Sequence, residues 1–224
     1  MTKRTALVTG GNRGIGLEVC RKLLGHGWTV YLGSREPSRG ALAAAGLQGD
    51  VHAVTLDVAD PGSVAATFAA TGPVDVLINN AGIHYDTGQS ASRADPRIIA
   101  EAFAVNLFGS WTLARTYAPA MRAKGWGRIV NVSSEAGSLA GMTGGTPAYS
   151  TSKAALNALT RCLAGELHGT GVLVNAVCPG WTDTDMGCGG RPVAEGARSV
   201  VWAALLPDGG PTGGFFRDGR PMDW

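Results

Sequence analysis

The sequence predicts a single-domain α/β fold, in which a doubly wound parallel sheet of about seven strands carries helices on both faces. Short runs rich in β-branched and apolar residues alternate along the chain with longer stretches of helical spacing. Most runs are apolar nearly throughout, as strands covered by helices on both faces require. The chain has 224 residues, a length typical of one α/β domain, so we expect residues 1–224 to form a single domain.

The predicted strands come in chain order with a helical or loop segment after each. They cover residues 5–9, 28–32, 51–56, 74–79, 127–132, 172–177 and, as the weakest, 214–217. Because helical segments separate most of the strands, right-handed crossovers into a parallel sheet are the expected connections.

Three stretches carry predicted helices. Residues 14–26 place Ile15, Val19 and Leu23 at helical spacing. Residues 96–124 are long enough for a helix that Pro119 is expected to kink, and residues 148–168 predict another. Between residues 187 and 196, Gly, Pro and Arg replace periodic apolar residues, which predicts a flexible loop beside any site formed at the strand ends.

Composition excludes several classes of protein. The chain has 34 glycines, about twice the usual share of roughly 7%. They follow no three-residue period and apolar segments separate them, which excludes collagen and extended disorder. The 19 Lys and Arg residues against 17 Asp and Glu residues are scattered, so we expect no nucleic-acid partner.

Cysteine usage and hydropathy place further limits. The four cysteines include no C-x-x-C pair and the four histidines do not cluster with them, so we expect no metal. No stretch approaches the 18 or so apolar residues of a membrane span, and the first apolar run starts too early for a signal peptide. We therefore expect no membrane partner and a cytoplasmic location with reduced thiols.

A glycine-rich segment, Thr-Gly-Gly-Asn-Arg-Gly-Ile-Gly at residues 9–16, closes the first predicted strand and opens the first helix. This context is typical of dinucleotide-binding Rossmann domains, in which glycines let the backbone approach a pyrophosphate at a helix N-terminus. Three residues separate Gly10 from Gly14, so the spacing is a variant; a tight turn without a ligand is the alternative. The predicted cofactor contacts here are Gly10, Asn12, Arg13, Gly14, Ile15 and Gly16.

The end of the second strand favours one cofactor. NAD-binding proteins usually place Asp or Glu there, where the carboxylate accepts the ribose hydroxyls. The sequence Leu-Gly-Ser-Arg at residues 32–35 has no such acid, and Arg35 together with Arg13 could bind a 2′-phosphate. The pair predicts NADP(H) over NAD(H), although either arginine alone is compatible with a solvated surface charge.

Five motifs in order resemble the short-chain dehydrogenase/reductase family. They are residues 9–16, Asn-Asn-Ala-Gly at 79–82, Ser134, Tyr-x-x-x-Lys at 149–153 and Pro-Gly at 179–180. The segments 105–107, 178–181, 184–186 and 211–218 resemble the NADPH-dependent carbonyl reductase branch. The resemblance covers nearly the whole chain and implies a single NADP(H)-binding Rossmann domain.

The pair Tyr149 and Lys153 supports acid–base chemistry on its own. The two residues are four positions apart on a predicted helix and so project from one face. A tyrosine has a pKa near 10. An ammonium at roughly 4 Å and an effective dielectric of about 20 would attract the tyrosinate by about 4 kcal/mol, which predicts a lowered Tyr149 pKa. An amphipathic helix with a buried Tyr and a solvated Lys is the alternative.

The resemblance also implies roles for the remaining catalytic residues. Ser134, with Ser133 as the competitor, would hold the substrate oxygen beside the Tyr149 hydroxyl. Asn106, inside the predicted long helix, would hold a water in the proton path through Lys153, or is merely structural.

Cofactor and substrate contacts follow from the same resemblance. Asp57 and Val58 would contact the adenine, Asn80, Ala81 and Gly82 the adenosine side, Pro179 and Gly180 the nicotinamide, Thr184 the carboxamide or phosphates, and Lys153 the nicotinamide ribose. Thr182 and Tyr149 are further predicted cofactor contacts. Trp181 and Met186 would flank the substrate together with Ser134 and Tyr149, or belong to the core. His84 and Tyr85 would face the same pocket or the surface.

Together these residues predict an NADPH-dependent oxidoreductase that reduces a ketone or aldehyde, with Tyr149 as proton donor and a small carbonyl or alcohol compound as partner. Alcohol oxidation, an epimerising or tailoring step in secondary metabolism, and a non-catalytic NADP(H) sensor are the alternatives. Residues 134–149 lack the long helical insertion that keeps some carbonyl reductases monomeric, so a homodimer or homotetramer stays open.

Overall fold

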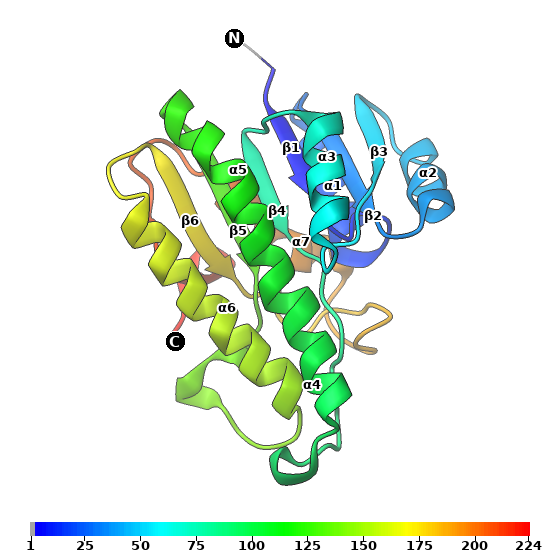
Figure 1. The fold of residues 1–224 in the computed structure, drawn as a ribbon, viewed down its shortest axis with the longest axis vertical. Helices are drawn as coiled ribbons and strands as arrows, with labels where there is room; N and C mark the ends of the chain where they lie inside the picture. Colours follow the sequence, from blue (N-terminus) through cyan, green and yellow to red (C-terminus); the bar gives the residue numbers. More distant parts are fainter. Residues whose placement is uncertain (1–2) are drawn as a thin grey trace.

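Eight strands form one sheet in a computed structural model of the chain, which describes residues 3–224 (Figure 1). Their order across the sheet is β3-β2-β1-β4-β5-β6-β7-β8, and all pairs are parallel except β7 with β8. The strands are β1 (Thr5–Val8), β2 (Thr29–Ser34), β3 (Val51–Thr55), β4 (Val76–Asn79), β5 (Gly127–Val132), β6 (Val172–Val177), β7 (Phe215–Arg217) and β8 (Arg220–Pro221). The predicted doubly wound α/β fold is confirmed.

Helices cover both faces of this sheet. They are α1 (Gly14–Gly25), α2 (Pro37–Ala45), α3 (Pro61–Thr71), α4 (Pro96–Phe103), α5 (Ser110–Lys124), α6 (Pro147–Glu166) and α7 (Val193–Ala204). Helices α3, α5 and α6 pack on one face, with α1, α2 and α7 on the other. No helix within residues 3–224 has the length and apolar character needed to cross a membrane.

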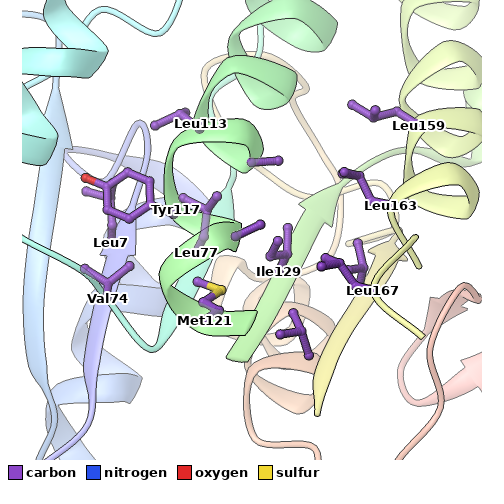
Figure 2. Close-up of a cluster of buried hydrophobic side chains, with 14 of the residues drawn as sticks. Leu7, Val74, Leu77, Leu113, Tyr117, Met121, Ile129, Leu159, Leu163 and Leu167 are labelled. Atoms are coloured by element: carbon purple, nitrogen blue, oxygen red, sulfur yellow. The ribbon is translucent and has the colours of Figure 1, made fainter. Parts of the chain in front are cut away.

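Each face has its own hydrophobic core, because successive residues of a strand point to opposite sides. In β1, Leu7 faces the α5 and α6 side, whereas Ala6 and Val8 face α1 and α7. Figure 2 shows the first core, in which side chains of α5, α6 and the sheet meet, among them Leu77, Tyr117 and Leu163. This two-sided burial explains why the strand segments are apolar nearly throughout.

Strand β8 was not predicted, so the estimate of about seven strands is one short. Arg217 and Arg220 are paired across a two-residue turn in which Asp218 and Gly219 both have positive φ, 52° and 75°. An Asp-Gly pair favours this kind of hairpin turn, so the signal was present in the sequence. The missed strand is only two residues long.

The predicted helix over residues 96–124 is interrupted, and the position of its predicted kink was wrong. Helix α5 continues through Pro119, whereas a π-helical turn, Ala104–Gly109, separates α4 from α5. Asn106 lies within this turn and bonds the backbone of Ile83 through its side chain. The interruption therefore follows a tertiary contact instead of the proline.

The predicted loop over residues 187–196 ends four residues earlier. Helix α7 begins at Val193 directly after Pro192, a residue that is common at helix starts. Gly196 packs against Thr182 so closely that an added Cβ would lie 2.5 Å from the Thr182 Oγ1 atom. The segment before α7 also pairs with itself through a bridge between Thr182 and Arg191, and its flexibility stays a prediction.

The turn from α6 into β6 offers a test of packing at the amino ends of the parallel strands. Gly169 and Gly171 have similar left-handed φ values, 75° and 79°, but an alanine Cβ would meet nothing within 4 Å at Gly169 and would lie 2.0 Å from the Gly125 oxygen at Gly171. We expect Gly169→Ala to lower the free energy of unfolding by about 1–2 kcal/mol through backbone strain alone. Gly171→Ala should cost about 1–3 kcal/mol more, because of the clash. Urea denaturation of both variants measures the difference, and equal costs would contradict the structure.

Candidate functional site

A cavity of about 940 Å³ opens at the carboxyl ends of the parallel strands, where the strand order reverses between β1 and β4. Ligands of open α/β sheets bind at this position. Of the predicted site residues, only Asn106 does not line the cavity. Those that line it are Gly10, Asn12, Arg13, Gly14, Ile15, Gly16, Arg35, Asp57, Val58, Asn80, Ala81, Gly82, Ser134, Tyr149, Lys153, Pro179, Gly180, Trp181, Thr182, Thr184 and Met186.

The glycine-rich segment is held in place by the end of β4. The Asn80 side chain donates to the carbonyls of Thr9 and Gly10, at 2.9 and 3.2 Å, while the Thr9 hydroxyl accepts the backbone N–H groups of Asn80 and Ala81. At Gly16 an added Cβ would lie only 2.3 Å from the Gly10 oxygen. The turn is therefore too tight for any side chain at Gly16.

This arrangement fits a dinucleotide. Among residues 3–224 no side chain caps the N-terminus of α1, so its first backbone N–H groups stay available for a phosphate. The cavity also has the length that the predicted contacts require, since it runs from the end of β2 to Tyr149 on α6. The residues present thus suit a nicotinamide dinucleotide at this site.

The end of β2 carries more charge than was predicted. Arg35 is exposed and lines the cavity, together with Glu36 and Arg39. The Glu36 carboxylate pairs with Arg39 at 2.9 Å, and within residues 3–224 no acidic side chain pairs with Arg35. Glu36 and Arg39 were not predicted; Arg35 precedes α2, which begins at Pro37, so no helical spacing relates Arg35 to Arg39.

Arg13 reaches across the cavity to a distant segment. Its guanidinium forms an ion pair with Asp185, and both side chains are largely exposed. The glycine-rich segment is thereby connected to the residues that follow β6. Because exposed pairs contribute little to stability, Arg13 is free to exchange this partner for another anion.

Tyr149 and Lys153 lie near the start of α6 and line the same cavity, as their spacing predicted. The Lys153 Nζ atom lies 5.6 Å from the centre of the Tyr149 ring. It donates a hydrogen bond to the Val132 carbonyl at the end of β5, at 2.8 Å. Both residues are buried.

Burial dominates the ionisation of this pair. It raises the pKa of Tyr149 to about 12, although a hydrogen bond with Ser134 acts in the opposite direction. Burial also lowers the pKa of Lys153 to about 8. The expectation that Lys153 depresses the Tyr149 pKa was therefore wrong for this structure, because burial is the largest cause of the shift and the opposing contact comes from Ser134 instead of Lys153.

The two candidate serines differ in their partners. Ser133 is buried and its hydroxyl donates to the Lys153 carbonyl at 3.4 Å. The Ser134 hydroxyl accepts the Ala136 N–H at 3.2 Å, and it lies close enough to the Tyr149 hydroxyl to lower the pKa of that phenol. This difference favours Ser134 as the serine that shares a substrate oxygen with Tyr149.

Asn106 lies behind the cavity wall, in the π-helical turn and fully buried. Its amide group donates to the Ile83 carbonyl at 3.1 Å and to the Ser152 hydroxyl at 2.9 Å, and its oxygen accepts the Ile83 N–H at 2.9 Å. Together these bonds connect the π-helical turn to the segment after β4, through Ile83, and to α6, through Ser152. The side chain has an evident structural role, which leaves its predicted catalytic role untested.

Aromatic side chains gather above Tyr149. The Tyr85 ring packs against the Tyr149 ring with 5.1 Å between their centres, and the Trp181 ring lies 5.5 Å from Tyr85. Trp181 and Met186 are partly exposed in the cavity, so neither belongs to the core. His84 and Tyr85 were each expected either in the pocket or at the surface. Tyr85 lines the cavity, whereas the His84 side chain bonds Glu101 on α4 at 2.6 Å.

A buried cysteine was missed. The Cys178 Sγ atom accepts hydrogen bonds from the Glu135 and Gly180 N–H groups, at 3.2 and 3.3 Å, and from Arg217 at 3.1 Å. It lines the cavity near Tyr149 and Lys153. Arg217 comes from β7, so no local sequence pattern could have joined these groups.

Comparison with known proteins identifies relatives over the whole chain. The sequence model described as short chain dehydrogenase matches residues 4–191. The chain is 35% identical to (+)-neomenthol dehydrogenase of Arabidopsis thaliana, with 96% of each chain covered, and 31% identical to salutaridine reductase of Papaver bracteatum, with 95% and 94% covered. The solved structure of NADPH-bound carbonyl reductase from chicken fatty liver superposes with a TM-score of 0.86 at 29% identity, covering 100% of both chains.

The lowered pKa of Lys153 predicts a pH dependence of stability. Between about 8 and the ordinary value of 10.5, the unfolded chain binds more protons than the folded protein, so this lysine makes stability rise with pH in that window. The contribution is about 3 kcal/mol, from about 1.4 kcal/mol per pKa unit. Lys153→Met should therefore gain stability relative to the parent at pH 7 and lose much of that advantage by pH 10.5.

Denaturant unfolding from pH 7 to 10.5 measures this difference, with Lys22→Met on α1 as the control for general alkaline effects. A difference between the Lys153→Met variant and the parent that stays constant across the window would contradict the burial of a charged Lys153.

Proposed function

Because the chain belongs to the short-chain dehydrogenase family, whose members are oxidoreductases that use nicotinamide cofactors on small molecules, we propose that it is an NADPH-dependent reductase of a ketone or aldehyde. The observation that carries the proposal is the meeting of Ser134, Tyr149 and Lys153 in a cavity that also contains the N-terminus of α1, which has no side-chain cap among residues 3–224. A non-catalytic dinucleotide sensor would need no such acid–base group.

Residues along the cavity would hold the cofactor. Gly10 to Gly16 and the N-terminus of α1 would bind the pyrophosphate, while Pro179, Gly180 and Lys153 would contact the nicotinamide end. When bound, the nicotinamide supplies the hydride that reduces the carbonyl carbon. The protein's remaining task is to orient the carbonyl and move one proton.

Tyr149 is suited to donate that proton. With a pKa of about 12, its hydroxyl is fully protonated at neutral pH and ready to protonate the substrate oxygen as negative charge develops there. Ser134 would donate a second hydrogen bond to the same oxygen and so stabilise the developing charge. Lys153, with a pKa of about 8, is mostly charged at pH 7 and would stabilise the tyrosinate and return a proton to it, with Asn106 positioning the surrounding backbone.

Charge around the β2 end supports the preference for NADPH. Arg35 is exposed in the cavity without an acidic partner among residues 3–224, and Arg13 has only an exposed one. Glu36, which could repel a phosphate, pairs with Arg39. These arginines would bind a 2′-phosphate with planar, multi-donor guanidinium groups.

The substrate half of the cavity supports a neutral substrate. The cavity-lining residues within 83–88 and 141–146 contain no charged side chain, and Tyr85, Trp181 and Met186 provide apolar surface. The charged side chains beside them in the cavity lining, Glu135, Asp183 and Asp185, are all acidic and would disfavour an anionic substrate. A compound with an uncharged, apolar body around its carbonyl group fits this surface better than one that carries a carboxylate or a phosphate.

Replacement of the proposed acid tests the reaction. Tyr149→Phe removes the proton donor and leaves the ring, so we expect kcat/KM for a good ketone substrate to fall by at least about 100-fold. The Kd for NADPH, measured by its fluorescence, should change less than twofold. Tyr31→Phe on β2, outside the cavity, is the matched control. A Tyr149→Phe variant that consumes NADPH at the parental rate would refute the mechanism.

Cofactor preference has its own test. Arg35→Ala should weaken NADPH binding about tenfold, which corresponds to about 1.4 kcal/mol, and leave NADH binding nearly unchanged, because only NADPH carries the 2′-phosphate. Arg122→Ala, at the end of α5, controls for the loss of a surface charge. Equal affinity of the parent protein for NADPH and NADH would contradict the assignment.

A further inference from the structure

Helix α6, which carries Tyr149, is capped by a residue from a distant loop. We propose that Asp86, together with its neighbour Tyr85, is a positioning residue that fixes Tyr149 for proton transfer. The inference rests on the proposed function, since it concerns the same reaction. Asp86 is not part of any motif that the sequence singled out, and it does not line the cavity.

The start of α6 lacks a cap of its own. The Thr146 side chain makes no capping bond to the backbone, because its hydroxyl bonds the Ser150 hydroxyl at 2.8 Å. Pro147, the first helical residue, has no N–H group. The first free donors of the helix are therefore the N–H groups of Ala148 and Tyr149.

Asp86 satisfies both of these donors. Its Oδ2 atom accepts the Ala148 N–H at 3.0 Å and its Oδ1 atom accepts the Tyr149 N–H at 3.1 Å, across 62 and 63 positions of sequence. A carboxylate at a helix N-terminus is favourable, since it meets the positive end of the helix dipole. One carboxylate thus holds the main chain of the residue that donates the proton.

Tyr85 holds the side chain of the same residue. Its ring packs edge-to-face on the Tyr149 ring, with 5.1 Å between centres and an angle of 73° between the planes. Trp181 lies on Tyr85 in turn, at 5.5 Å. Two adjacent loop residues therefore constrain both the backbone and the ring of Tyr149.

The loop that carries them is itself anchored on both sides. Ile83 bonds Asn106 through its N–H and its carbonyl, His84 bonds Glu101 on α4, and the Gly88 N–H donates to the Gly145 carbonyl at 3.1 Å. Because these contacts fix the loop before and after Asp86, its carboxylate is presented at a defined position. Asn106 supplies the first of these contacts, because its side chain bonds both backbone groups of Ile83.

The cap should affect Tyr149 more than Lys153. Tyr149 lies in the first turn of α6, whose backbone depends on Asp86, whereas Lys153 lies one turn later and is tied to the Val132 carbonyl at 2.8 Å. Loss of the cap should loosen the first turn and leave the cofactor side of the cavity intact. The expected signature is a lowered kcat with unchanged NADPH affinity.

The experiment compares cap removal at α6 with cap removal elsewhere. Asp86→Asn has nearly the same size but retains only one acceptor oxygen, so it keeps at most one of the two bonds. Asp86→Glu retains the carboxylate and should recover part of the activity. Asp60→Asn is the matched control, because Asp60 caps α3 by accepting the Gly62 N–H at 2.9 Å and lies outside the cavity.

We expect Asp86→Asn to lower kcat about tenfold, with the NADPH Kd and the KM of the ketone each within about twofold of the parent values. Amide hydrogen exchange should speed up in residues 148–151 and stay unchanged in residues 156–164. Asp86→Glu should restore kcat to within about threefold of the parent value. Asp60→Asn should lower the Tm to a similar extent and leave kcat unaltered.

Two results would overturn the proposal: parental kcat in Asp86→Asn, or an equal loss of kcat in Asp60→Asn, which would mean that stability alone is responsible. Amide hydrogen exchange reports the order of the first turn of α6 without any catalytic activity, so the positioning role can be tested independently of the proposed function. If the parent protein reduces no ketone, the reductase proposal fails, while unchanged exchange at residues 148–151 in Asp86→Asn would refute the positioning role.

Discussion

The burial of Lys153 is the constraint around which the site is organised. A charged ammonium away from water needs oxygen partners, and the Val132 carbonyl at the end of β5 is the partner that the fold supplies. This bond fixes the second turn of α6 against the sheet edge. The position of Tyr149 one turn earlier, and of Ser134 two residues beyond Val132, then follows from helix and strand geometry.

Because of this burial, neither Tyr149 nor Lys153 has its ordinary pKa. Water is excluded from the phenol and the ammonium alike, so each is shifted toward its neutral form. Coulomb attraction estimated from spacing alone takes no account of this loss of hydration. Tyr149 therefore stays protonated at neutral pH, and Lys153, with a pKa of about 8, can lose and regain a proton close to neutrality. This combination suits an acid that must donate a proton and then recover it.

Most of the fold could be predicted from the sequence, because two-sided burial makes the strands apolar and places glycines where the backbone turns tightly. The sequence motifs also predicted which residues lie close together, and all of the motif site residues but Asn106 line one cavity. What could not be predicted depends on contacts between segments far apart in the chain. The π-helical turn at Asn106 arises from its bonds to Ile83, and the cap of α6 comes from Asp86. The start of α7 at Val193, after Pro192, and the Asp-Gly turn before β8 have local sequence signals and were therefore predictable in principle.

Strand β8 has a consequence for behaviour at high protein concentration. An open sheet exposes a row of unpaired backbone groups at its edge, to which another chain can add a strand. Here that edge is formed by a strand of two residues, of which Arg220 carries a charge and Pro221 has no N–H to donate; both are exposed. Such an edge offers little template for intermolecular β-pairing. The short antiparallel strand thereby protects the β7 side of the sheet from edge-to-edge aggregation.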